Sequence, residues 1–76
     1  MSEHVIEITS PWIKLDAALK LSMIALSGGE AKSMIGEGLV FVDEEPEYRR
    51  GRKVYPGSRI RCQDNVFIIT RDENNG

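Results

Sequence analysis

The stretch of sequence that decides the fold covers residues 27–42 and reads SGGEAKSMIGEGLVFV. It begins with Ser27 and has Glu30 three residues later, which is the capping-box pattern of a helix N-terminus. The apolar residues that follow at helical spacing are Ala31, Met34 and Ile35. Gly38 suits the C-terminal end of this helix, and residues 39–42 form an apolar run typical of a strand. The stretch therefore predicts a domain that mixes helix and strand.

Toward the N-terminus, the sequence predicts one strand and one further helix. Residues 5–9 (VIEIT) have the composition of a short strand, and the Ser-Pro pair that follows should end it. Apolar residues at helical spacing then predict a helix over residues 15–24. Asp16 and Lys20 form an i,i+4 pair with the acid first, which is the favourable order on a helix. Two short helices joined by a tight turn follow.

Toward the C-terminus, the pattern is that of strands and turns. It predicts a partly extended basic stretch over 48–55, a turn at 56–57, a strand over 59–62, a hairpin turn at 64–65 and a closing strand over 66–70. Residues 72–76 are expected to form a disordered tail. The predicted fold class is α+β, with two short helices packed on a small antiparallel sheet. Residues 1–71 are expected to form a single domain.

Composition places the chain among small folded proteins of a reducing compartment. Its 76 residues make one domain, and 41% hydrophobic and 29% charged residues are ordinary values for such a domain. No apolar run approaches the ~20 residues that a membrane span requires, and the first residues lack a signal-peptide pattern. The single cysteine, Cys62, excludes an internal disulfide. We expect a cytoplasmic protein that has no membrane partner.

The net charge of −2 hides a strong asymmetry along the chain. Residues 1–47 contain three basic and nine acidic groups, whereas residues 48–61 contain six basic groups and no acidic one. Local charge decides what a surface attracts once separations approach the ~8 Å screening length of physiological salt. The 48–61 segment should therefore present a positively charged surface to any partner.

The densest part of this segment is Arg49-Arg50-Gly51-Arg52-Lys53. Guanidinium groups offer forked donors that match phosphate oxygens, and they stack on bases. One alternative is an edge strand that is kept charged to prevent aggregation. Alternating charge would be enough for that purpose, however, and four cations in five positions repel one another until an anionic partner relieves the repulsion.

A second candidate feature is the helix start at residues 27–30. A helix N-terminus presents free backbone N–H groups, and Gly28 and Gly29 would leave these donors open to a phosphate, with Lys32 nearby. The alternative is a plain helix–helix turn with a capping residue. Glu30 favours this alternative, because its carboxylate would fill or repel the anion site.

The remaining reactive and aromatic residues point away from catalysis. Cys62 falls on the apolar face of an alternating strand, so we expect a buried thiol, and His4 has no partner in the sequence. One cysteine and one histidine cannot make a usual zinc site. We therefore expect no enzyme activity, no catalytic residue, no metal and no cofactor. Among the aromatic residues, Tyr48 and Tyr55 flank the basic run and could stack on bases, whereas Trp12 should pack at the edge of the core.

These motifs together resemble a known family. The matching pieces are residues 13–16 (IKLD) through 19–21 (LKL), residues 27–32 (SGGEAK), 34–35, 37–38, 40–42, 47, 49–53 (RRGRK) and 57. They are similar to the S-four RNA-binding domain, whose core is called the alpha-L RNA-binding motif, and in particular to its small stand-alone bacterial members. The resemblance covers about residues 5–62, and the combination of SGGEAK with RRGRK is more specific than either piece alone.

The resemblance implies a fold of two short helices on a small sheet, and binding of structured RNA, often ribosomal, by the helix pair and the adjoining loop. The RNA-binding residues that it implies are Lys14, Ser27, Gly28, Gly29, Lys32, Arg49, Arg50, Arg52 and Lys53. The chain departs from the family pattern at two places. It has Asp43-Glu44 where the family usually has Asn-Gly, and Gly57-Ser58 where the family usually has Gly-Asp. The first departure should place acids beside the RNA surface.

The sequence is compatible with three functions. The leading one is a monomeric module that binds structured RNA, with ribosomal RNA and ribosomal particles as partners and ribosome assembly as the process. The alternative is a protein-interaction module whose arginine patch binds an acidic partner. A ubiquitin-like sulfur carrier has a similar size but ends in Gly-Gly, whereas this chain ends in Asn75-Gly76.

Overall fold

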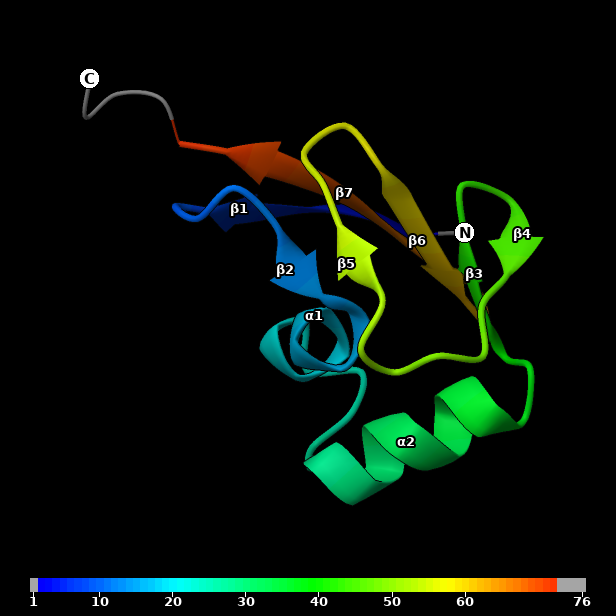
Figure 1. Cartoon of the computed structure of the whole chain (residues 1–76). Coiled ribbons are helices and arrows are strands. Elements are labelled where there is room, and N and C mark those ends of the chain that lie inside the picture. The colour runs from blue at the N-terminus through cyan, green and yellow to red at the C-terminus, as the bar shows by residue number, and fades with distance from the viewer. Residues whose placement is uncertain (1, 73–76) are drawn as a thin grey trace.

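The structure is a computed structural model, and it describes residues 2–72. Its elements are β1 (Ser2–Ile8), β2 (Ile13–Lys14), α1 (Leu15–Leu21), α2 (Gly28–Gly36), β3 (Val40–Val42), β4 (Glu45–Pro46), β5 (Lys53–Val54), β6 (Arg59–Cys62) and β7 (Asn65–Arg71). Five strands form a sheet in the order β1-β7-β6-β3-β4, and β2 and β5 form a second, small sheet. Figure 1 shows the two helices gathered on one side of the strands. The predicted α+β class is confirmed.

The five-stranded sheet is mixed, which corrects the expectation of a purely antiparallel sheet. The pairings β3–β4, β3–β6 and β6–β7 are antiparallel, as predicted. Strand β1, however, runs parallel to β7, with Ser2 opposite Asn65 and Ile8 opposite Arg71. Parallel neighbours need a long connection, and here almost the whole chain lies between them. Alternation of apolar residues predicts a strand but carries no information about its direction.

Helix α1 is shorter than predicted, and helix α2 begins where predicted. Helix α1 ends at Leu21, three positions before the expected end at Ile24. The chain turns at Met23, whose φ of 69° lies in the left-handed region. At the start of α2, the Ser27 hydroxyl oxygen accepts a hydrogen bond from the Glu30 N–H at 3.1 Å, as the capping box requires.

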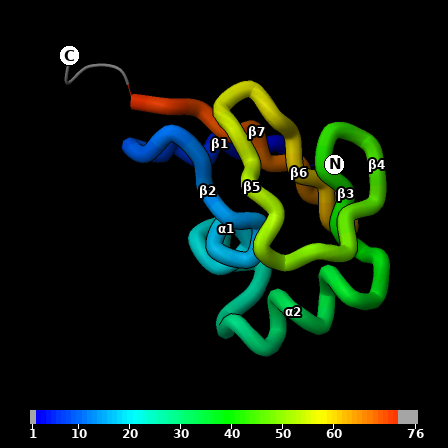
Figure 2. Tube along the Cα trace, viewed as in Figure 1, coloured from blue at the N-terminus to red at the C-terminus, as the bar shows by residue number. Residues whose placement is uncertain are grey.

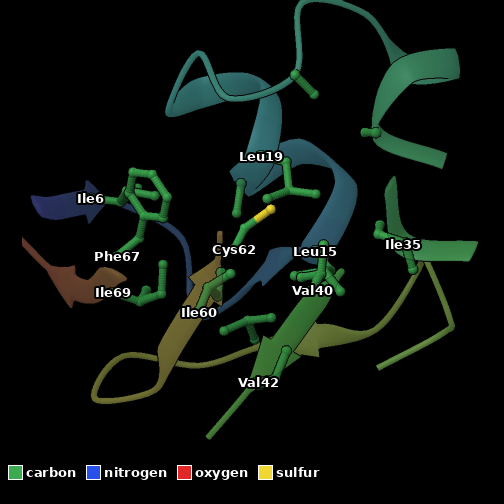
Figure 3. Close-up of a cluster of buried hydrophobic side chains, with 14 of the residues drawn as sticks. Ile6, Leu15, Leu19, Ile35, Val40, Val42, Ile60, Cys62, Phe67 and Ile69 are labelled. Atoms are coloured by element: carbon green, nitrogen blue, oxygen red, sulfur yellow. The ribbon is translucent and has the colours of Figure 1, made fainter. Parts of the chain in front are cut away.

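One core joins the helices to the inner face of the sheet, and Figure 3 shows its side chains. The fully buried members with the largest volumes are Leu15, Leu19, Ile35, Ile60, Ile69, Val40, Val42, Val54 and Cys62. In Figure 3 the sulfur of Cys62 points toward Leu19 of α1. The buried thiol is confirmed, and burial raises the pKa of Cys62. Such a thiol is a packing group and a poor nucleophile at neutral pH.

The turns and the chain end differ in detail from the prediction. The two-residue turn between β6 and β7 consists of Gln63 and Asp64, one position earlier than expected, and Gln63 has a φ of 59°. Of the predicted tail, residues 73–76 lie outside the described residues. The backbone N–H of Asp72 donates to the Ile8 carbonyl at 2.9 Å, so this residue continues the β1–β7 pairing.

Gly38 and Gly36 provide a matched test of the end of α2. Gly38 has a φ of 78°, and a Cβ placed on it would lie 3.4 Å from the Tyr48 ring, whereas a Cβ on Gly36 would meet no atom within 4 Å. Gly38→Ala is expected to lower the free energy of unfolding by about 1 kcal/mol, because a side chain is strained in the left-handed region. Gly36→Ala should raise this free energy by about 0.5 kcal/mol. Urea unfolding of both variants gives the comparison, and equal effects would contradict the assigned backbone geometry.

Candidate nucleic-acid interface

The basic run lies in a loop that caps the N-terminus of α1. The loop connects β4 to β5, and Figure 2 shows it, in yellow-green, passing the start of α1. Its backbone carbonyls accept hydrogen bonds from the first free N–H groups of the helix: Leu15 donates to Arg52 at 2.9 Å, and Asp16 donates to Arg50 at 3.1 Å. The loop backbone therefore caps α1 in place of a side chain, since Lys14 at the N-cap position makes no side-chain cap.

Glu47 binds two of the three arginines of the loop. It is 7% exposed, although glutamate is seldom buried. Its Oε2 accepts from the backbone N–H of Arg49 at 3.0 Å and from Nε of the same residue at 3.1 Å. Its Oε1 accepts from Nη1 of Arg52 at 2.5 Å. The hydrogen bond from Arg49 is the main reason that the pKa of Glu47 falls to about 2; burial opposes the shift, and Arg52 adds to it.

The same glutamate leaves much of the loop charge available to a partner. The side chain of Arg49 remains 76% exposed although it is paired, whereas that of Arg52 is 35% exposed. The bond to Glu47 also raises the pKa of the Arg49 guanidinium. Arg50 is exposed and makes no side-chain hydrogen bond or ion pair within residues 2–72. Arg49 and Arg50 are therefore the accessible charges of the loop, and Arg52 is largely a holding group.

Two lysines extend this surface through the small sheet. Lys14 of β2 and Lys53 of β5 are directly opposite each other in the antiparallel pair, so their side chains share one face. Like charges in this arrangement repel, and a bound anion would relieve the repulsion. Nζ of Lys53 also lies 4.8 Å from the ring centre of Trp12, which is half-buried as expected. We call the group around the start of α1 the cationic cluster: Lys14, Arg49, Arg50, Arg52 and Lys53.

The start of α2 is a separate feature in the structure. Glu30 completes the capping box by accepting a hydrogen bond from the Leu26 N–H at 3.2 Å through its Oε1. A Cβ on Gly28 would meet no atom within 4 Å, so the space beside the helix end is open, and Lys32 is exposed. Within residues 2–72, no hydrogen bond or ion pair joins residues 27–32 to the cationic cluster. That residues 27–32 and the cationic cluster form a single RNA-binding surface remains a prediction.

The two remaining cations of the 48–61 segment lie elsewhere. Ile60 and Cys62 of β6 face the core, so Arg59 and Arg61 point to the opposite face of the sheet. Arg59 pairs with Glu3 at 3.7 Å, and the Arg61 guanidinium lies 4.3 Å from the ring centre of Phe41. The six basic residues of the 48–61 segment, which lie close together in the sequence, are thus divided between two faces of the domain.

The acids of the β3–β4 turn lie beside Arg59 and Arg61 and not beside the cationic cluster. Asp43 and Glu44 have φ values of 51° and 71°, the left-handed pair that Asn-Gly adopts most readily in a two-residue hairpin. Asp43 accepts a hydrogen bond from the Ser58 hydroxyl at 3.1 Å and one from the Arg59 N–H at 3.0 Å. Glu44 pairs with Arg61 at 3.6 Å. These contacts direct both acids to β6 and the turn before it.

The sequence indicated the cations but not the role of Glu47. The signals were the match of residue 47 to the family pattern and its place two positions before a basic run, and neither shows which arginines it binds. Tyr48 and Tyr55 are both exposed, with the Tyr48 ring against Gly38. Within residues 2–72, no group of three His, Cys, Asp or Glu side chains could hold a metal ion. Neither helix of the described chain has the length and apolar character needed to cross a membrane.

The fold and the cluster define a small α+β domain that presents cations around a helix start. The family model of the S4 domain matches residues 6–70, and the chain belongs to this family, which is typically RNA-binding. The chain is also 41% identical over 58 residues to the "Probable ribosome maturation protein RlbA" of Bacillus subtilis (strain 168). That alignment covers 76% of this chain and 82% of the relative. The resemblance stated from the sequence motifs is confirmed.

Proposed function

We propose that this chain binds structured RNA through the cationic cluster, that the RNA is ribosomal, and that binding serves ribosome assembly. The observation that carries the proposal is the double anchoring of the loop. Its carbonyls cap α1, and Glu47 holds two of its arginines, so the cations are positioned before a ligand arrives. Pre-positioned charge binds a phosphate backbone with less ordering cost than a mobile loop. The name of the relative, a probable ribosome maturation protein, supports a role in ribosome assembly.

The residues divide into contacting and positioning groups. Lys14, Arg49, Arg50 and Lys53 contact phosphates, while Arg52 contributes charge from its bond to Glu47. Residues Ser27, Gly28, Gly29 and Lys32 form a second contact on the same RNA. Recognition is by shape and backbone, as is usual for helical RNA. The chain acts as a monomeric cytoplasmic domain over residues 1–71, with ribosomal particles as its partners and with neither a cofactor nor catalysis.

The salt dependence of binding tests this assignment. Each phosphate contact contributes about 0.7 to 0.9 to the slope of log affinity against log salt. The double variant Arg50→Ala with Lys53→Ala is expected to reduce the magnitude of this slope by about 1.4 to 1.8. The measurement is fluorescence anisotropy with a ribosomal RNA hairpin between roughly 50 and 200 mM salt. Arg52 is left intact, because its removal would also release Glu47.

Arg59→Ala is the matched control for the salt test. Arg59 is a cation of the same basic segment, but it lies on the other face of the sheet and pairs with Glu3. Its loss should leave the slope within experimental error of the parent chain. An unchanged slope in the double variant, or an equal loss in the control, would remove the cationic cluster as the contact surface. A complex recovered from cells that survives nuclease treatment would favour an acidic protein as the partner.

A further inference from the structure

No strand among residues 2–72 covers the outer edge of β1. Strand β1 is an end member of the five-stranded sheet, with β7 as its neighbour on one side only. Ser2 donates to the Asp64 carbonyl, and the Ile8 carbonyl accepts from Asp72, so the even-numbered residues of β1 bond toward β7. Strand geometry then turns the N–H and C=O groups of Glu3, Val5 and Glu7 outward. No backbone partner for these three residues exists within residues 2–72.

A groove runs beside this open edge. It has a volume of about 520 Å³, within the range of binding pockets. One wall is the consecutive run of residues 4–7, which means that the strand edge itself lines the groove. The opposite wall comes from the end of α1 and the turn after it, through Leu21, Ser22 and Ile24, and Phe67 of β7 adds to the lining. An extended segment placed here would gain backbone pairing and apolar contact together.

Exposed apolar side chains and acidic side chains line or border this groove. Val5 is 65% exposed and Leu21 is 58% exposed, and both line the groove. Glu7 lines it as well, and Glu3 lies on the same face of β1 with Val5 between them, exposed and paired with Arg59. Neither lysine nor arginine is among the lining residues. The groove is therefore partly apolar and partly polar, with an acidic border, which repels a phosphate backbone and attracts an apolar segment flanked by cations.

A second copy of this chain is a poor occupant of the edge. Two β1 strands paired antiparallel about Val5 would place Glu3 of each copy opposite Glu7 of the other. Like charges directly opposite each other in a sheet are destabilising. A segment with lysine or arginine at those positions would instead make two cross-strand ion pairs.

We infer that the open edge of β1 and its groove dock an extended protein segment that has apolar residues flanked by lysine or arginine, and that adds to the sheet as a sixth strand. The acids on the outer face pair with the cations of the segment, and its inward side chains contact Leu21 and Ile24. This site lies apart from the cationic cluster and does not depend on the proposed RNA binding. The domain then carries an RNA surface and a protein surface.

The test is an NMR titration of the full chain with the amidated peptide Gly-Lys-Leu-Val-Leu-Lys-Gly. Saturating shifts are expected at the amides of Glu3, Val5 and Glu7 and over residues 21–24. Hydrogen exchange at those three β1 amides should slow by at least ~10-fold in the complex, because a sixth strand would pair them. Two control peptides, one with proline at the centre and one with glutamate in place of lysine, should bind at least ~10-fold more weakly.

Two protein variants separate docking from general attraction. Glu7→Lys leaves each peptide with one attractive and one repulsive cross-strand pair, so the lysine and glutamate peptides should bind about equally. Leu21→Ala keeps all charges and should weaken the lysine peptide by about 3- to 10-fold, because it removes part of the apolar wall. The inference is overturned by an absence of β1 shifts up to ~1 mM peptide, by equal binding of the proline peptide, or by concentration-dependent β1 shifts without peptide, which would indicate a second copy.

Discussion

Replacing Glu47 with glutamine is expected to lower the free energy of unfolding by about 2 kcal/mol. The substitution keeps the shape of the side chain but removes the charge that Arg49 and Arg52 share. Hydrogen bonds to a charged group contribute about 1.5 to 3 kcal/mol each, and the exposure of Arg49 places the loss toward the low end. Glu45→Gln is the control, since this nearby glutamate is exposed and has no ion pair within residues 2–72. Its effect should stay within about 0.5 kcal/mol.

The pH dependence of stability gives the same prediction a second readout. The pKa of Glu47 is about 2 in the folded chain against 4.5 as its ordinary value, so the unfolded chain binds more protons between these two pH values. The contribution of Glu47 is therefore complete above pH 4.5 and is lost as the pH falls toward 2. The difference in unfolding free energy between parent and Glu47→Gln should shrink over this window. A difference that stays constant down to pH 2 would show that the charge of Glu47 is not what stabilises the loop.

Replacing Leu15 with alanine is expected to lower the free energy of unfolding by about 3 kcal/mol, the largest effect of a single substitution that we predict. Leu15 is fully buried, and it is also the first residue of α1, whose N–H donates to the Arg52 carbonyl. The truncation leaves a cavity in the core at the helix end that the basic loop caps. A domain of this size has only a few kcal/mol of net stability, so the variant should be close to unfolding at 37 °C.

The matched control for Leu15→Ala is Leu21→Ala in the same helix. Leu21 is the last residue of α1 and is largely exposed, so the same chemical change should cost less than about 1 kcal/mol. Urea unfolding followed by circular dichroism measures both variants. Equal losses would mean that helix propensity rather than packing explains the effect. Amide exchange at Arg49 to Lys53 should rise in the Leu15 variant alone, because the loop rests on that end of the helix.

Local patterns in the sequence were sufficient for the elements and much of the core. The capping box at Ser27 placed the start of α2, and the alternation in β6 placed Ile60 and Cys62 in the core. Helix α1 was predicted too long because residues 22–27 contain no glycine or proline. Met23 supplies the left-handed turn instead, and no propensity rule anticipates this residue there.

Long-range relations could not be obtained in the same way. The parallel partner of β1 is determined by how the whole chain wraps around the core. The division of the basic segment depends on which side of β6 each arginine faces, and on where the loop before β5 meets α1. The role of Glu47 follows only from the folded loop, because its partners Arg49 and Arg52 lie two and five positions after it and no regular element has both spacings. The proposed contact residues themselves remain a prediction that the salt experiments address.

The parallel pairing of β1 with β7 also has a consequence for how the protein is made. Every paired position in this ladder joins residues 63 positions apart in a chain of 76. During synthesis, β1 leaves the ribosome before β7, the strand with which it pairs. Contacts this distant in sequence slow folding relative to local ones. Strand β1 therefore stays without its β7 partner until residues 65–71 have been synthesised.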